Sequence, residues 1–321
     1  MLLTREEQID TLHAAAQSWG IDVAKSDIDW SDETVQLGEL KIHYLDWGVA
    51  GKPPLLLLHG GMQSAHSWDL TAVVMKRDYH VVAMDLRGHG DSDWADDYSH
   101  AATMSDVAGL VEHLGWPRLS LMGLSMGGLA AMNYASEHSD RLDALVIVDV
   151  GPELNAGGVG RIVEFGRGPA ELDTVEEFVE QAIAYNPHRK PEQLRYSLTH
   201  NLRQLPDGKW TWKYDQRLSR RRPETEQRDE SQDGSQPSAR HFSFSDLWER
   251  LKRITCPTLV VRGGDSDVFA EATALKMIEL LPDGRFVTVP DAGHTVAQDN
   301  PRDFLPAVRP FFDETRGSSR S

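Results

Sequence analysis

Six short apolar runs alternate along the chain with segments that have helical hydrophobic spacing. The runs are PLLLLH (54–59), HVVAMD (80–85), RLSLMG (118–123), DALVIVDV (143–150), PTLVVRGG (257–264) and RFVTVPD (285–291). Most are apolar at consecutive positions and too short for an ordinary helix, as in strands buried on both faces. Helical patterns occupy 103–114, 127–137, 246–253, 270–281 and 302–313. This alternation predicts an α/β fold with a mostly parallel central sheet and helices on both faces.

The N-terminal part of the chain differs from this pattern. Residues 4–19 have the spacing of an amphipathic helix, and we expect residues 1–33 to form a helical extension. Residues 34–47 alternate in polarity and predict one or two antiparallel strands. Thr103 and Asp106 resemble a capping box and would start the 103–114 helix.

A long internal segment, residues 152–245, contains no run typical of a buried strand. Helical pieces at 174–185 and 191–202 predict a helical cap, inserted into a core made of residues 34–151 and 246–313. Residues 219–240 are almost free of apolar side chains and predict a mobile polar loop within the cap. We expect residues 314–321 to form a disordered tail.

The charge of the chain narrows the choice of partners. Lys and Arg number 33 against 50 Asp and Glu, a net charge of −17, which argues against nucleic acid and anionic membrane surfaces. The single cysteine, Cys256, excludes an intrachain disulfide, and the first residues lack the apolar region of a signal peptide. We therefore expect a cytoplasmic monomer or homodimer that acts on a small molecule.

The stretch GLSMG (123–127) follows one apolar run and opens a helical segment. This is the context of a G-x-S-x-G turn, in which a serine is held out at a sharp strand-to-helix junction. Gly127, Gly128, Ala130 and Ala131 would let the helix approach the sheet closely, and its N-terminus would direct free N–H groups at the site. The pattern predicts that Ser125 is a nucleophile.

A serine hydroxyl needs a base to take its proton. Of 13 histidines, His294 lies in a glycine-containing loop just after the last strand, at the end of the sheet where open α/β folds place their sites. His59 and His89 are rivals, which we expect to hold loops by hydrogen bonding.

The base in turn needs a carboxylate. Asp149 follows the fourth apolar run, and Asp265 and Asp267 follow the fifth. The order Ser, Asp, His along the chain fits all three, and the glycine turn favours the loop at 263–268.

An oxyanion needs two N–H donors held in place. One should be the N–H of Met126, the residue after the serine. The other should come from HGGMQ (59–63), where glycines let the backbone approach a ligand; Gly61 is the first candidate and Met62 the alternative.

The chain resembles an α/β-hydrolase of the type that carries a cap. HGG (59–61), DLRGHGDS (85–92), GLSMGG (123–128), RGGDSDV (262–268) and GHTVAQDNP (293–301) are similar to landmarks of that family, in the family's order, over residues 34–313 apart from the cap. The resemblance implies Ser125 as nucleophile, His294 as base and Asp267 as acid. Serine at this place argues against the dehalogenases and epoxide hydrolases, and GLSMGG is more like esterases and enol-lactonases.

We therefore expect hydrolysis of a carboxylic ester or lactone of a small apolar substrate through an acyl-enzyme, without metal or cofactor. Two alternatives remain: a carbon–carbon bond hydrolase that uses the same triad, and a ligand-binding receptor with incidental turnover. Trp210, Trp212, Tyr214 and Phe165 of the cap are candidates for a substrate pocket. An equally good interpretation places them in the cap's own core.

Overall fold

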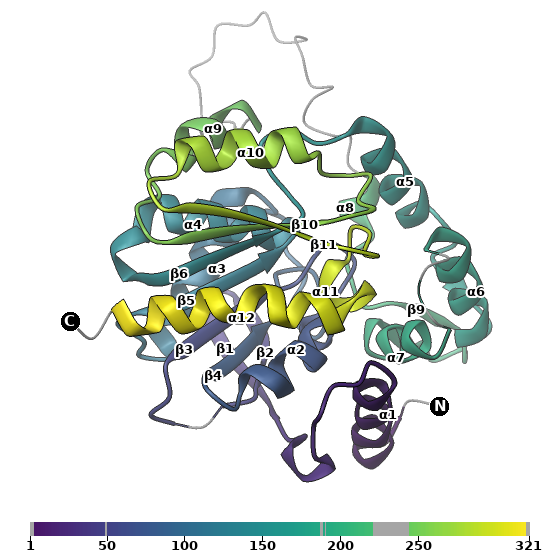
Figure 1. The fold of residues 1–321 in the computed structure, drawn as a ribbon. Helices are drawn as coiled ribbons and strands as arrows, with labels where there is room; N and C mark the ends of the chain where they lie inside the picture. The colour runs from purple at the N-terminus through teal and green to yellow at the C-terminus, as the bar shows by residue number, and fades with distance from the viewer. Residues whose placement is uncertain (1–2, 49, 187–188, 190, 221–243, 319–321) are drawn as a thin grey trace, which may run out of the picture.

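A computed structural model describes residues 3–48, 50–186, 189, 191–220 and 244–318. Eight strands form one sheet in the order β1-β2-β4-β3-β5-β6-β10-β11 (Figure 1). All pairs are parallel except β1 with β2 and β2 with β4. The strands are β1 Ser31–Leu37, β2 Leu40–Asp46, β3 Pro54–Leu58, β4 His80–Met84, β5 Leu119–Leu124, β6 Leu142–Val148, β10 Thr258–Gly263 and β11 Gly284–Val289. The predicted α/β class and mostly parallel sheet are confirmed.

Helices cover both faces of this sheet. The pleat directs alternate side chains to opposite faces, so Leu55 and Leu57 of β3 join one hydrophobic core while Leu56 and Leu58 join the other. The first core also contains residues of α1 (Arg5–Ser18), α2 (Asp69–Met75) and α12 (Pro301–Ser318). The second contains residues of α3 (His100–His113), α4 (Met126–His138), α9 (Phe244–Leu251) and α10 (Glu271–Leu280). Short helices lie at η1 Lys25–Asp27, η2 Ala65–Trp68, η3 Ser139–Arg141 and α11 Val296–Asp299.

Two predicted boundaries are wrong. Helix α3 begins one turn before the expected capping box, because the Ser99 side chain caps it by accepting a hydrogen bond from the Ala102 N–H. Helix α12 continues to Ser318, through part of the tail that we expected to be disordered. Its Thr315 is buried, and the hydroxyl donates to the Phe311 carbonyl. None of the helices in the described ranges is both long and apolar enough to cross a membrane.

The segment between β6 and α9, here called the cap, is not purely helical. It contains α5 Ala156–Gly166, β7 Glu171–Leu172, α6 Val175–Tyr185, α7 Pro191–Asn201, β8 Leu202–Gln204, β9 Trp210–Trp212 and α8 Arg217–Arg220. Its strands pair as a small antiparallel sheet, β7-β9-β8, and helices α5, α6 and α7 lie beside the main sheet (Figure 1). Of the predicted polar loop 219–240, residues 219 and 220 belong to α8, and the rest lies outside the described residues.

Helix α4 lies directly against the backbone of the sheet, because its contact positions lack side chains. A Cβ added to Gly127 would lie 2.3 Å from the Leu58 carbonyl oxygen and 2.5 Å from that of His59. A Cβ on Gly123 would lie 2.2 Å from the Gly127 carbonyl oxygen. Only glycine therefore fits at either position, and the glycines set the position at which α4 begins.

We expect Gly127→Ala to lower the free energy of unfolding by at least about 2 kcal/mol, since backbone atoms must move to admit the methyl group. Gly160→Ala in α5 is the matched control, because a Cβ there meets nothing within 4 Å. Alanine is the better helix former, so that control should gain up to about 1 kcal/mol. Urea unfolding of the two variants measures both values, and equal stability of both would contradict this packing argument.

Candidate active site

Ser125 occupies the turn between β5 and α4 in a backbone conformation that side-chain-bearing residues seldom adopt. Its φ is 51° and its ψ is −118°. Such strain persists only where the surrounding structure enforces it. Here the Ser125 N–H donates to the Val148 carbonyl of β6 at 2.9 Å, and the Ser125 carbonyl accepts from the Leu129 N–H of α4. The turn places the hydroxyl at the N-terminus of α4, as the sequence predicts.

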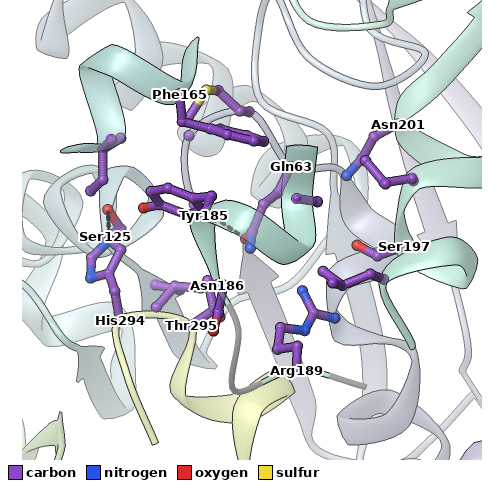
Figure 2. Close-up of a pocket in the computed structure, with 18 of the residues that line it drawn as sticks. Gln63, Ser125, Phe165, Tyr185, Asn186, Arg189, Ser197, Asn201, His294 and Thr295 are labelled. Carbon is purple, nitrogen blue, oxygen red and sulfur yellow. Dashed lines mark hydrogen bonds between the residues drawn. The ribbon is translucent and has the colours of Figure 1, made fainter. Parts of the chain in front are cut away.

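Three side chains form a hydrogen-bonded chain that starts at this serine. His294, in the loop after β11, has Nε2 2.9 Å from Ser125 Oγ (Figure 2). Its Nδ1 lies 2.8 Å from Asp149 Oδ2. The Asp149 side chain is fully buried, and that of His294 is 13% exposed. An imidazole held between a hydroxyl and a carboxylate can take the hydroxyl proton and remain stabilised as a cation.

Asp149 directly follows β6 and is fixed by three donors. Besides His294, Oδ1 accepts from the Gly263 N–H at 2.9 Å and Oδ2 accepts from Ser266 Oγ at 2.5 Å. Its φ of 52° turns the chain sharply at the end of the strand. These contacts hold the carboxylate in one orientation beside the imidazole.

The choice of Asp267 as the partner of His294 is therefore wrong. The Asp267 side chain is 40% exposed and forms an ion pair with Arg161 of α5. Ser266 is the residue of that loop whose side chain reaches Asp149. The sequence signal for Asp149 is its place directly after an apolar run, which makes it one of the three candidate carboxylates. The glycine turn at 263–268 favours the wrong loop.

The rival histidines hold loops, as expected. His59 Nε2 accepts from the Leu86 N–H at 3.0 Å, and Nδ1 lies 2.7 Å from the Gly60 carbonyl. His89 Nδ1 lies 3.1 Å from the Arg87 carbonyl. Burial lowers the pKa of His59 and lowers that of His89 to about 3, so both rings are neutral at pH 7.

The residues predicted as oxyanion donors lie around the serine. Gly61, Met62 and Met126 line the same cavity as Ser125. The N–H of Gly60 donates to Gln63 Oε1, which leaves Gly61 as the next backbone N–H at the end of β3. Met126 is the first residue of α4, where an N–H has no partner within the helix.

The cavity over Ser125 has a volume of about 170 Å³ and lies between the cap and the core (Figure 2). Of the four aromatic candidates, Phe165 and Trp212 line it. Trp210 and Tyr214 do not line it and are buried in the hydrophobic core of the cap. Phe165 and Trp212 stay candidates for contact with a substrate, and all four residues belong to or pack against the cap's own core. Besides Ser125 and His294, the cavity has polar lining residues that sequence reasoning missed, namely Gln63, Tyr185, Asn186, Arg189, Ser197, Asn201 and Thr295.

Two groups of metal-ligand side chains lie outside this cavity. Asp85 lies near His43 and Asp91, and its oxygens accept from His43 and from the N–H groups of Ala65 and Asp91, which explains that group without a metal.

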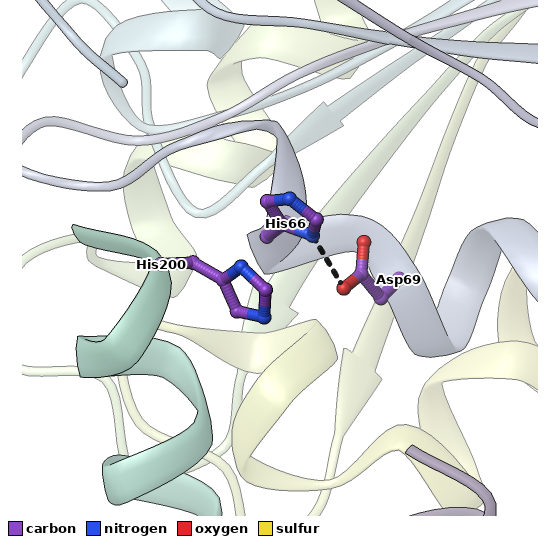
Figure 3. Close-up of side chains that lie close together, drawn as sticks. All are labelled: His66, Asp69 and His200. Atoms are coloured by element: carbon purple, nitrogen blue, oxygen red, sulfur yellow. Dashed lines mark hydrogen bonds and ion pairs between the residues drawn. The ribbon is translucent and has the colours of Figure 1, made fainter. Parts of the chain in front are cut away.

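The second group joins α7 of the cap to the core (Figure 3). Asp69 Oδ2 lies 2.8 Å from His66 Nδ1, and the His66 and His200 rings stack 3.6 Å apart. Asp69 Oδ1 and His200 Nε2 are buried and have no partner within the described part of the chain. The ligand atoms of these three residues lie close enough together that they could hold a metal ion.

The chain belongs to the α/β-hydrolase fold family, which matches residues 53–301. Esterase Rv0045c of Mycobacterium tuberculosis is 30% identical over 292 residues, 88% of this chain and 89% of that protein. The 3-hydroxybutyrate-oligomer hydrolase of Cupriavidus necator is 30% identical over 285 residues, 85% of this chain and 92% of that protein. A crystal structure of the M. tuberculosis esterase matches with a TM-score of 0.72 at 28% identity, over 97% of this chain and 99% of that one. The resemblance is confirmed: this is a hydrolase fold with esterases among its relatives.

The buried His200 predicts a loss of stability in acid. Burial, His66 and Lys213 hold its pKa well below the ordinary value, so the unfolded chain takes up a proton first as the pH falls below about 6.5. The contribution of His200 to the free energy of unfolding is therefore fully present above that pH. Below it the contribution falls by up to about 1.4 kcal/mol per pH unit. Unfolding free energies between pH 8 and pH 5 should fall more steeply for the wild type than for His200→Phe, which keeps a ring beside His66. Equal slopes would contradict the assignment.

Proposed function

We propose that the protein hydrolyses a carboxylic ester, with Ser125 as nucleophile, His294 as base and Asp149 as acid. The observation that carries this proposal is the continuous chain of hydrogen bonds from Ser125 Oγ through both ring nitrogens of His294 to Asp149. The strained turn that presents the serine adds support, because such conformations cluster at sites of chemistry. The esterases among the relatives support the same reaction.

The reaction proceeds in two halves. Ser125 Oγ attacks the ester carbonyl carbon while His294 Nε2 takes the hydroxyl proton. The carbonyl oxygen becomes an oxyanion, which the N–H groups of Gly61 and Met126 stabilise. Collapse of the tetrahedral intermediate breaks the ester C–O bond, and the alcohol leaves with the proton from His294. Water then gives its proton to His294 and attacks the acyl-enzyme, which releases the carboxylic acid and returns the proton to Ser125.

The cavity favours a small substrate with an apolar part. Leu124, Phe165, Leu198 and Trp212 give it an apolar lining near the reacting serine. Burial of apolar substrate surface there supplies binding energy, and the few polar residues orient the ester. A carboxylic ester or lactone of modest size fits this description.

Replacing Ser125 with alanine removes the nucleophile and should lower kcat by three or more orders of magnitude on a 4-nitrophenyl ester. The methyl side chain fits wherever the hydroxymethyl group does, so the melting temperature should change little. A fluorophosphonate should label the wild type and leave the variant unlabelled. Peptide mapping should locate the label at Ser125. Near-wild-type turnover by a folded Ser125→Ala protein would rule out the mechanism.

Substitution of each candidate carboxylate by asparagine should show which of the two acts with His294. Asp149→Asn favours the wrong imidazole tautomer and should lower kcat by about 10³–10⁴-fold. Asp267→Asn is the matched control, since Asp267 lies on the surface beside Arg161 and should retain kcat within a few-fold. Steady-state kinetics on one ester, with melting curves for both variants, measures the difference. A severe loss in Asp267→Asn alone would restore the assignment implied by the resemblance.

A further inference from the structure

Arg189 places a buried cation at the end of the cavity opposite the nucleophile. Figure 2 shows Ser125 and His294 at one side of the cavity lining and the Arg189 guanidinium at the other. The Arg189 side chain is only 9% exposed. Burial lowers its pKa from the ordinary value, although a guanidinium stays charged at neutral pH. A buried charge of this kind is costly unless an anion and hydrogen-bond acceptors compensate it.

The protein itself compensates this charge incompletely. The carboxylate of Asp299 is 3.9 Å from Arg189 Nε, beyond hydrogen-bond distance. Its oxygens already accept from Thr295 Oγ1, Asn186 Nδ2 and the Gly293 N–H. Arg189 Nη1 makes one long contact of 3.4 Å to Gln298 Oε1. Nε is buried without a hydrogen-bond partner among the described residues.

The charges of the residues that line the Ser125 cavity suit a bound anion. Among its lining residues in the described part of the chain, none is acidic, and Arg189 is the one that carries a permanent charge. Gln63, Ser197 and Asn201 add neutral polar groups to the lining of this cavity.

A second cavity of about 620 Å³ lies on the other side of Arg189, next to α1. Asp10, Asp69 and Glu192 line that cavity, so their carboxylates would repel an anion there. An anion that pairs with the Arg189 guanidinium is therefore favoured in the cavity of Ser125 and disfavoured in the second cavity.

We propose that Arg189 binds a carboxylate of the substrate while the ester carbonyl lies at Ser125. The substrate class is then an ester that carries a negative charge: a monoester of a dicarboxylic acid, or an ester of a hydroxy acid whose own carboxylate is free. The planar guanidinium can meet the two carboxylate oxygens with two parallel N–H donors. This inference rests on the proposed function and adds the charge of the substrate to it.

Matched pairs of substrates test the charge directly. For a carboxylate on the acyl side, 4-nitrophenyl hydrogen glutarate is compared with 4-nitrophenyl hexanoate. For a carboxylate on the alcohol side, 4-acetoxybutanoate is compared with 4-acetoxybutanamide. In at least one pair the wild type should prefer the charged ester by about 10- to 100-fold in kcat/KM, the range of a charge-assisted hydrogen bond. The pair that shows the preference identifies the side that faces Arg189.

Variants then assign the preference to Arg189. In Arg189→Met the ratio of kcat/KM for the charged and neutral esters should fall to about one, and Arg189→Lys should keep part of the preference. Arg195→Met is the control, because Arg195 lies on the outer side of α7, half exposed and paired with Glu176, and should keep the wild-type ratio.

The outcomes separate this inference from the proposed function. Hydrolysis of neutral and charged esters at equal rates by the wild type would overturn the inference and leave the ester hydrolase in place. A wild-type preference that survives in a folded Arg189→Met protein would overturn it as well. Failure of the wild type to hydrolyse any of the four esters, with no labelling of Ser125 by a fluorophosphonate, would instead contradict the proposed function. Because the wild-type ratio decides by itself, an Arg189 variant that fails to fold does not remove the test.

Discussion

The close contact between α4 and the backbone of the sheet is the constraint on which the site depends. Gly127 lies against the carbonyls at the end of β3, and Gly123 lies under the first turn of the helix. With the helix fixed there, the residue between β5 and α4 must adopt a positive φ, and Ser125 is that residue. The same helix start brings the Met126 N–H to the cavity. The contact between the glycines and the backbone of the sheet thus positions both the nucleophile and a candidate oxyanion donor.

The cap completes the cavity through a few specific contacts with the core. Tyr196 donates to Asp69 Oδ2 at 2.5 Å, and Ser64 donates to Asn201 Oδ1 at 2.7 Å. Both contacts come from α7, the helix whose Leu194 and Leu198 also belong to the cap's hydrophobic core. Leu194, Leu198 and Trp212 of the cavity lining therefore belong to the interior of the cap, while Leu124 comes from the core beneath it.

Sequence reasoning succeeded where the signal lies within a few residues. Strands, the turn at Ser125 and the loop of His294 follow from local hydrophobic period and glycine placement. The carboxylate partner depends on tertiary structure: Asp149 and Asp267 both follow strands, and only the folded loop shows that Ser266 turns inward while Asp267 meets Arg161. Strands β7 and β8 of the cap have two and three residues, too few for a period to be visible. Arg189 gives no sequence signal at all, because its burial beside the cavity depends on the folded structure.

The contact between Asp149 and Ser266 also bears on which strand of this sheet can carry the carboxylate of the site. The ends of β6 and β10 are neighbours in the sheet, and the Ser266 hydroxyl lies 2.5 Å from the Asp149 oxygen that faces His294. A carboxylate introduced at 266 would begin within hydrogen-bond distance of the place that Asp149 now occupies. The loops after β6 and β10 can therefore each bring a carboxylate to the same position beside His294. With Asp149 replaced as well, two point substitutions would move the carboxylate from the end of β6 to the end of β10, with the imidazole, the nucleophile and the order of the strands left in place.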